Sequence, residues 1–121
     1  MKYLLLIYGN EAADAQRPQS EQEREMQAYF EYTDQIGKAG VMVGGEALHP
    51  VSTATTVRLR EGKLTTTDGP FAETKEQLGG FYLLDCKNLD EAINWASKIP
   101  HAAIGSIEIR PVVDFSQATS A

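Results

Sequence analysis

The chain has 121 residues, of which 42% are hydrophobic and 23% charged, a composition that is ordinary for one soluble globular domain. Its net charge is −6 and its basic residues form no run, so nucleic acid is not an expected partner. Cys86 is the single cysteine, so no disulfide can form within the chain. The apolar run at the start is too short for a signal peptide or a membrane span, and we therefore expect a cytoplasmic protein that binds no membrane.

The first forty residues predict a strand followed by a helix. Residues 2–8 are apolar on both faces of an extended chain, and the polar residues 9–19 are typical of a loop. Ser20 followed by Glu23 has the spacing of a capping box, which predicts that a helix begins there. A stripe of mostly apolar side chains then recurs at helical spacing, at Met26, Tyr29, Phe30, Thr33 and Ile36. Gly40 suits the left-handed position that closes such a helix.

The middle of the chain predicts three more elements. They are a strand over residues 41–48, a β-hairpin over residues 54–67 and a strand over residues 80–86. Glu61-Gly62 supplies the turn of the hairpin. Asp68-Gly69-Pro70 breaks the pattern after it, and the polar stretch 71–78 is expected to be irregular. The last of these strands is apolar on both faces, like the first strand of the chain.

The final third predicts a second helix and a last strand. Asn88 and Glu91 repeat the helix-start pattern, and Pro100 stops the helix. Alternation over residues 106–110 predicts the strand, with its isoleucines inward. We therefore expect one domain over residues 1–115 and a frayed tail over residues 116–121.

The order of these elements favours a ferredoxin-like α+β fold, βαββαβ with an inserted hairpin. Two strand–helix–strand units with right-handed crossovers place both helices on one face of an antiparallel sheet. The two strands that are apolar on both faces then lie in its centre. Because the helices cover only one face, the other would expose a large apolar patch. We therefore expect a homodimer that pairs sheet against sheet; the alternative is that the hairpin and the loop over residues 68–79 fold back over this face.

Residues 66–81, TTDGPFAETKEQLGGF, strongly resemble the signature of the DGPF family within the wider YCII-related group. Further pieces that match are residues 1–9, residues 44–48, and residues 99–100 together with 105–111. The resemblance spans nearly the whole chain. It implies a dimeric α+β barrel, the same arrangement that the hydrophobic pattern favours.

The resemblance implies less about function. Members of this family often sit beside, or are fused to, alternative sigma factors, which makes a sigma factor a candidate partner. In the wider group a histidine on the first helix, together with an aspartate, is suggested as a catalytic pair. The comparable helix position here, counted back from Gly40, is Tyr29. This departure from the pattern argues against the histidine-based mechanism.

Asp68 is the main candidate for a catalytic residue. In Asp68-Gly69-Pro70 the aspartate can hydrogen-bond the backbone two residues on, the glycine relieves the turn and the proline fixes φ, so a structural turn explains all three. Alternatively, the turn holds the carboxylate at a cleft, where it can act as an acid or a base. Because the family signature continues past the turn, we expect a site in this loop.

Four further residues are candidates for binding a ligand, each with a plainer interpretation. Lys75 could hold an anionic ligand and Glu73 lies in the same loop, although both also suit a solvated surface. Glu46 follows two glycines that permit close approach, on an edge strand where a solvent-facing glutamate is the plainer reading. Arg110 could clamp a carboxylate through two hydrogen bonds or pair with Glu108 on an exposed face.

The histidines and the cysteine carry no predicted chemistry. His49 and His101 are expected in exposed loops, and neither has a second ligand at metal spacing. Cys86 has no neighbouring base and is expected to be buried and inert. The chain has no phosphate loop and no dinucleotide fingerprint, so neither a cofactor nor a metal is expected.

Two functions are compatible with the sequence. The first, which we favour, is the binding or conversion of a small polar or anionic molecule in a cleft between sheet and helices, with Asp68 as acid or base. The second is a non-catalytic interaction module that presents the loop to a regulatory partner such as a sigma factor. A partner surface should expose large apolar or aromatic anchors, and the loop offers only Phe71.

Overall fold

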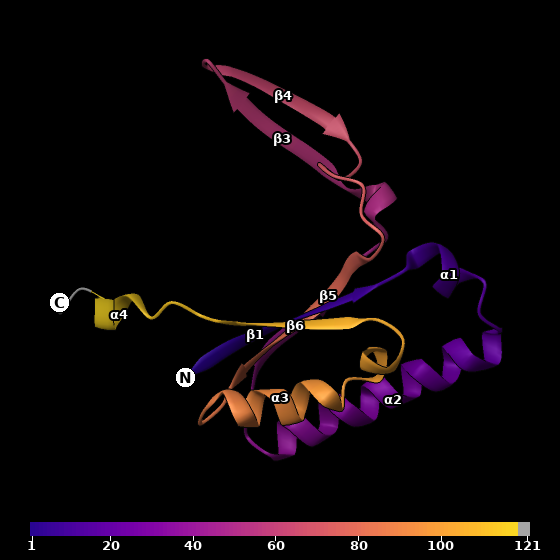
Figure 1. Cartoon of the computed structure of the whole chain (residues 1–121), viewed down its shortest axis with the longest axis vertical. Helices are drawn as coiled ribbons and strands as arrows, with labels where there is room; N and C mark the ends of the chain where they lie inside the picture. The colour runs from indigo at the N-terminus through magenta and orange to yellow at the C-terminus, as the bar shows by residue number, and fades with distance from the viewer. Residues whose placement is uncertain (119–121) are drawn as a thin grey trace.

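The computed structural model describes residues 1–118, and its centre is a four-stranded antiparallel sheet (Figure 1). The strand order is β2-β5-β1-β6. The bounds of these strands are Lys2–Gly9 for β1, Met42–Ala47 for β2, Gln77–Asp85 for β5 and Ser106–Pro111 for β6. The central strands β1 and β5 are the two that are apolar on both faces. This confirms the predicted ferredoxin-like α+β fold with the order βαββαβ.

The inserted hairpin is also confirmed. It consists of β3 (Thr55–Arg60) and β4 (Lys63–Asp68), which form a separate two-stranded sheet. Its turn has positive φ at both central residues, 53° at Glu61 and 75° at Gly62. A two-residue turn of this kind matches the right-handed twist of the strands it joins, and glycine supplies one of the two left-handed positions without strain.

Two helices, α2 (Gln19–Lys38) and α3 (Leu89–Ser97), cover one face of the main sheet (Figure 1). The predicted start of α3 is confirmed, because Oδ1 of Asn88 accepts a hydrogen bond from the Glu91 backbone N–H at 2.9 Å. The predicted capping box of the first helix is wrong. Pro18 stands at the N-cap of α2 without a side-chain cap bond, and Ser20 lies within the first turn. Proline fits there because the first residues of a helix have no intrahelical partner for their N–H groups.

The core lies between this sheet face and the two helices. Leu5 of β1, Ile36 of α2 and Leu84 of β5 are fully buried. The predicted stripe of α2 is partly wrong, because Met26 and Phe30 are exposed and Tyr32 is buried instead. The Tyr32 hydroxyl donates a hydrogen bond of 2.9 Å to the Trp95 backbone oxygen, which satisfies its polar end inside the core.

Short helical segments occupy stretches where the sequence analysis expected none. They are α1 (Glu11–Ala15), the 3-10 turns η1 (Val51–Thr53) and η2 (Pro100–Ala103), and α4 (Phe115–Ala118). The predicted loop over residues 9–19 thus contains a helix, which Asn10 caps by accepting a hydrogen bond from the Ala13 backbone N–H at 3.0 Å. α4 begins where the frayed tail was predicted, and residues 119–121 lie outside the described part. None of the described helices is both long and apolar enough to span a membrane.

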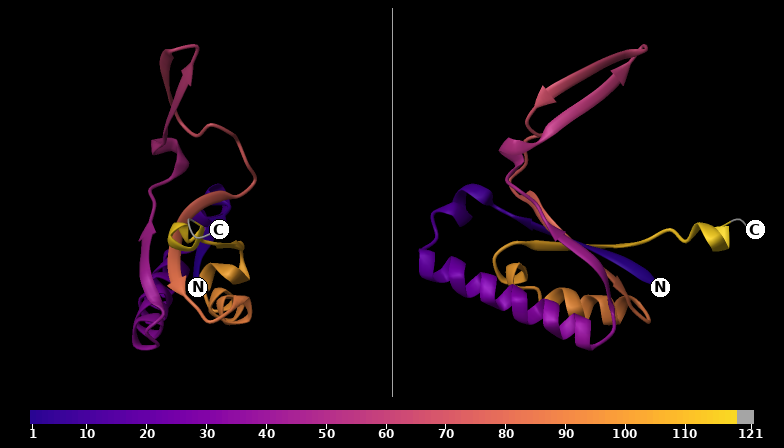
Figure 2. Two further views of the ribbon diagram at one scale, coloured as in Figure 1. Left: turned by 90° about the vertical axis from the view of Figure 1, so that its left-hand side faces the viewer. Right: turned by 180° about the vertical axis from the view of Figure 1, so that it is seen from behind.

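The second face of the sheet, which we call the open face, carries none of the helices in the described residues 1–118 (Figure 2). On it Leu4 pairs with Leu83 and Leu6 pairs with Phe81 across β1 and β5. Both figures show the β3–β4 hairpin on the side of the sheet opposite to α2 and α3, standing clear of the sheet. The hairpin therefore does not fold back over this face. The homodimer predicted from the uncovered apolar residues stays a prediction.

Candidate functional site

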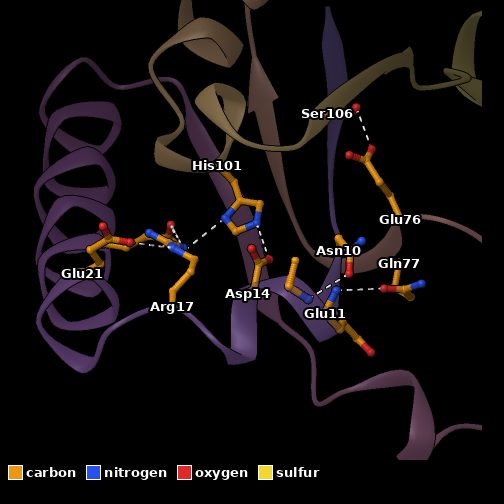
Figure 3. A network of polar contacts seen from close by, with 11 residues as sticks. Asn10, Glu11, Asp14, Arg17, Glu21, Glu76, Gln77, His101 and Ser106 are labelled. Atoms are coloured by element: carbon orange, nitrogen blue, oxygen red, sulfur yellow. Dashed lines mark hydrogen bonds and ion pairs between the residues drawn. The ribbon is translucent and has the colours of Figure 1, made fainter.

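His101 lies between two carboxylates where three helical segments meet (Figure 3). Its Nε2 is 2.9 Å from Oδ2 of Asp14 in α1, and its Nδ1 is 3.1 Å from Oε1 of Glu25 in α2. Only 12% of its side chain is exposed. The prediction of an exposed loop position for His101 is therefore wrong. The residue belongs to η2, which contacts both α2 and β1, and this packing turns the ring inward.

Arg17 extends this cluster on the far side of Glu25. Its Nη1 lies 2.8 Å from Oε2 of Glu25, and its Nε lies 3.4 Å from Oε2 of Glu21. The hydrogen bond with Glu25 raises the pKa of Arg17, so the guanidinium stays charged. Glu25 thus accepts a cationic donor on one oxygen and faces the imidazole with the other, which holds its carboxylate in one orientation.

The geometry of the cluster is suited to sharing a proton. An ionised carboxylate only accepts hydrogen bonds, and a neutral imidazole has a single N–H to donate. Because both ring nitrogens of His101 face carboxylate oxygens, both contacts are hydrogen bonds only if the ring carries two protons or one carboxyl group carries one. A proton shared in this way among three groups is what acid–base chemistry requires.

Two glycines leave room for the His101 ring. A Cβ atom on Gly9 would lie 2.4 Å from its Nε2 and 2.9 Å from Oδ2 of Asp14. A Cβ on Gly105 would lie 2.1 Å from the Tyr8 backbone oxygen and 2.9 Å from the ring. Side chains cannot approach this closely, so glycine at both positions is a condition for the cluster.

α1 is held in position by residues from two other parts of the chain. The Glu11 backbone N–H donates a hydrogen bond of 3.0 Å to Oε1 of Gln77, at the start of β5. The Glu11 carboxylate in turn accepts a hydrogen bond from the Val51 backbone N–H at 3.1 Å. These contacts fix α1 beside the sheet, and this brings Asp14 to the imidazole of His101.

The cluster forms one wall of a cavity of about 400 Å³ between α2 and the β2–β5 side of the sheet. Tyr29 and Tyr82 give it aromatic surface, whereas Phe81 lines it with its backbone because its side chain lies on the open face with Leu6. Thr33 Oγ1 and the Tyr82 hydroxyl share a hydrogen bond of 2.8 Å. Burial raises the pKa of Tyr29, so its phenol keeps its proton and can donate a hydrogen bond. An adjoining pocket shares seven lining residues with this cavity, including His101, so the two form one connected depression.

The charge of the cavity wall favours a particular class of ligand. The acidic residues that line it are Glu11, Asp14 and Glu25, together with Glu46, which faces it with its backbone only. Among the described residues that line it, none is a lysine or an arginine, and Arg17, which lines the adjoining pocket, is paired with Glu25. A wall with this excess of carboxylates repels an anion, whereas a neutral or cationic molecule meets no such penalty.

One of the five residues predicted to form a site lies at this cavity. Glu46 is part of its lining, although the register of β2 sets it opposite Phe81, so its side chain belongs to the open face and its backbone faces the cavity. Asp68 ends β4 at the base of the hairpin, away from the cavity, and Glu73 and Lys75 are exposed in the following loop. Arg110 lies opposite Leu4 on the open face. The structure does not bring these five residues together.

The signature segment has a structural role. Gly69 has a φ of 100°, its N–H donates to the Ala54 oxygen at 2.6 Å, and its oxygen accepts from Thr56 Oγ1 at 2.8 Å. The Asp68-Gly69-Pro70 turn thus closes the base of the hairpin. Further along, Ser106 Oγ donates to Oε1 of Glu76 at 2.7 Å, which ties β6 to the start of β5.

Sequence reasoning missed Asp14, Glu25 and His101. His101 is separated by 87 residues from Asp14 and by 76 from Glu25, so no local spacing could reveal the cluster. A signal was available for α1 alone, because an asparagine followed by acidic residues is a common helix start.

Comparisons with known proteins give a consistent result. A family profile described as "YCII-related domain" matches residues 1–116. A protein of Rhizobium meliloti (strain 1021) described as "Uncharacterized protein R00369" is 40% identical over 114 residues, which cover 93% of this chain and 92% of that protein. Among solved structures, 5-chloro-2-hydroxyhydroquinone dehydrochlorinase (TftG) from Burkholderia phenoliruptrix AC1100, in complex with 2,5-dihydroxybenzoquinone, is similar with a TM-score of 0.51 and 16% identity, over 97% of this chain and 98% of that one. At this identity the similarity supports the fold alone.

Proposed function

Because the chain belongs to the YCII-related family and carries a histidine between two carboxylates in the wall of a cavity, we propose that it binds and converts a small molecule there. The observation that carries this proposal is the pair of contacts, 2.9 Å and 3.1 Å, between the ring nitrogens of His101 and the oxygens of Asp14 and Glu25. A cavity of about 400 Å³ is within the usual size range of ligand sites.

Asp14 is the proposed proton acceptor. Its side chain is 29% exposed, and among the described contacts its Oδ1 has no hydrogen bond, whereas Oδ2 is taken by His101. Oδ1 can therefore accept a proton from a bound molecule while His101 stabilises the carboxylate through the other oxygen. Glu25, fixed by Arg17, holds the second ring nitrogen and so keeps the imidazole in place.

The proposed ligand is a neutral, hydroxylated single-ring compound, either aromatic or quinonoid. The aromatic side chains of Tyr29 and Tyr82 suit a flat ring, and the hydroxyl groups of Thr33 and Tyr82 can bond its substituents. The acidic lining speaks against the anionic ligand that we expected from Lys75. The structurally similar dehydrochlorinase was solved with 2,5-dihydroxybenzoquinone, which is a hydroxylated quinonoid single ring. The hydroxyl groups of that compound are vinylogous acids, so it supports the ring type of the proposed ligand and not its neutral charge.

The other expectations from the sequence stay predictions. Asp68, Glu73, Lys75 and Arg110 would contribute to this cavity only if another copy of the chain brought them to it. A homodimer formed through the open face is supported by the pairs Leu4–Leu83 and Leu6–Phe81, which a second sheet would cover. The sigma-factor partner and the cytoplasmic location have no further support in the described residues.

A thermal-shift screen with monocyclic phenols, hydroquinones and quinones tests the proposal. Wild type should be stabilised by at least one of them, since a ligand that binds only the folded state raises its melting temperature. Asp14→Asn and His101→Gln should bind the same compound at least tenfold more weakly. His49→Gln is the matched control, because His49 is the other histidine and lies exposed outside the cavity.

Circular dichroism of each variant separates loss of binding from loss of folding. Asp14→Asn keeps the shape of the side chain, removes its charge and turns one acceptor oxygen into an amide donor, so it tests the carboxylate with the least disturbance of packing. If the ligand raised the melting temperature equally in wild type, Asp14→Asn and His49→Gln, the cluster around His101 would not be part of the binding site. Shifts produced only by carboxylic acids would contradict the proposed ligand class.

A further inference from the structure

The β3–β4 hairpin has an apolar side with nothing over it. By the register of the two strands, Val57, Leu59 and Leu64 share one side of the ribbon. Their exposed fractions are 60%, 64% and 67%. A lone two-stranded hairpin is at best marginally stable in water, and three exposed aliphatic side chains make it less favourable still. The ribbon therefore needs a surface to pack against.

The total exposed surface area shows how much surface a partner could bury. The chain exposes 8704 Å², whereas a compact monomer of 13.3 kDa exposes about 6,500 Å² by the usual scaling of surface with mass. The excess of roughly 2,200 Å² is well above the ~800 Å² that each partner buries in a standard interface. In Figure 1 the hairpin and the segment after β6 project from the body, and the open face has none of the described helices over it.

The charge of the hairpin differs from that of the rest of the chain and lies on the side without the leucines. Residues 55–68 hold three basic and two acidic residues, a net charge of +1 in a chain whose total is −6, so the remainder carries −7. Arg60 and Lys63 lie directly opposite each other, with Arg58 on the same side. This basic side is opposite to the side with Leu59 and Leu64, so it stays toward solvent when the apolar side packs. The partner must therefore offer the arm an apolar surface.

The position of the hairpin fits a second copy. In Figures 1 and 2 it rises on the side of the sheet away from the helices, which is the side of the open face. A copy that packs on the open face therefore lies next to the hairpin as well, and twofold symmetry makes both contacts reciprocal. One partner covers both bare apolar surfaces.

We propose that the β3–β4 hairpin is an arm that clasps a second copy of this chain seated on the open face of the sheet. The arm packs the side with Leu59 and Leu64 onto the flank of that copy, and its basic side chains, on the opposite side of the ribbon, stay toward solvent. This goes beyond the proposed function, since it concerns a different surface from the cavity.

The test measures the dissociation constant of the dimer by sedimentation equilibrium. In one variant an Asn-Gly turn replaces residues 55–68; the ends are already adjacent, because the Gly69 N–H donates to the Ala54 oxygen at 2.6 Å. A second variant carries Leu59→Asp and Leu64→Asp. Both should weaken the dimer at least 100-fold. Thr67→Asp, on the opposite side of β4, is the matched control and should change it less than threefold.

The hairpin is not part of the main sheet, so circular dichroism should show that the main sheet is retained in the deletion variant. If the deletion variant fails to fold, the double-aspartate variant decides. A monomeric wild type, or a dissociation constant unchanged in the double variant, would overturn the proposal. Asp14→Asn, measured in the same assay, should dimerise like wild type, so a failure of the arm and a failure of the ligand site are distinguishable.

Discussion

The two faces of the central sheet are built from the same strands and serve different purposes. In β1, Leu5 is fully buried beneath the helices, whereas its neighbour Leu6 is only half-buried on the open face. The helix-covered face contains the core and, at its edge, the cluster around His101. The open face has apolar side chains, no helix above it and a projecting hairpin beside it. Alternation along a strand thus separates what holds the protomer together from what we expect to hold two protomers together.

Truncating one leucine on each face should give the largest effects and the clearest contrast. Leu5→Ala should lower the free energy of unfolding by about 3 kcal/mol, because it leaves a cavity in a packed core. This loss should not depend on protein concentration. Leu6→Ala should cost about 1 kcal/mol or less in the isolated chain, and more where the dimer forms.

Urea unfolding at two protein concentrations, about a hundredfold apart, measures the loss of unfolding free energy for each variant and shows whether that loss depends on dimer formation. Equal losses for Leu5→Ala and Leu6→Ala, with no dependence on concentration, would mean that the two faces do not differ in this way.

A methyl group at Gly9 should damage the site more than the fold. Its Cβ would overlap His101 Nε2, a side-chain atom that can move away, so we expect a cost on the order of 1–3 kcal/mol and a loss of ligand binding. Gly44→Ala in β2 is the control, since no atom lies within 4 Å of a Cβ there. Calorimetric titration with the ligand found in the screen compares the two. Retained affinity in Gly9→Ala would show that the position of His101 does not matter for binding.

High pH should weaken the helix-covered face through its tyrosines. Burial raises the pKa values of Tyr29 and Tyr32 above the ordinary 10.0. Below pH 10 both folded and unfolded states keep these protons, so stability is unaffected. Above it the unfolded state loses them first, and the free energy of unfolding falls as pH rises, by at most about 1.4 kcal/mol per pH unit for each tyrosine.

Tyr29→Phe removes one of these groups and should flatten the slope between pH 10 and the onset of unfolding. Urea unfolding across this pH range measures it. A slope identical to that of wild type would contradict the burial of the Tyr29 phenol as the cause.

The sequence predicted the sheet because its signal is local. Residues apolar on both faces identified β1 and β5 as central strands, and Glu61-Gly62 identified the hairpin turn. The rotation of α2 about its axis was not predictable in this way. Met26 and Phe30 have the spacing of a core stripe, yet the core selects Tyr32, whose hydroxyl finds its partner in α3.

The candidate site was not predicted, for a related reason. The most distinctive segment, residues 66–81, directed attention to Asp68, while its contacts close the hairpin and tie β5 to α1 and β6. The chemistry lies in residues that only the fold brings together. Nothing in the local sequence marks His101 as functional. It is the second residue of η2, directly after Pro100 and four positions past the end of α3 at Ser97.

The most direct test of the account is to observe the two histidine rings during ligand binding. Nitrogen-15 NMR of the ring nitrogens should give separate signals for His101 and His49, assigned with the single variants. Addition of the ligand found in the screen should shift the His101 signals in wild type, leave those of His49 in place, and have no effect in Asp14→Asn. Movement of His49 alone, or the same shifts of His101 in Asp14→Asn, would contradict the claim that this cluster is the working part of the site.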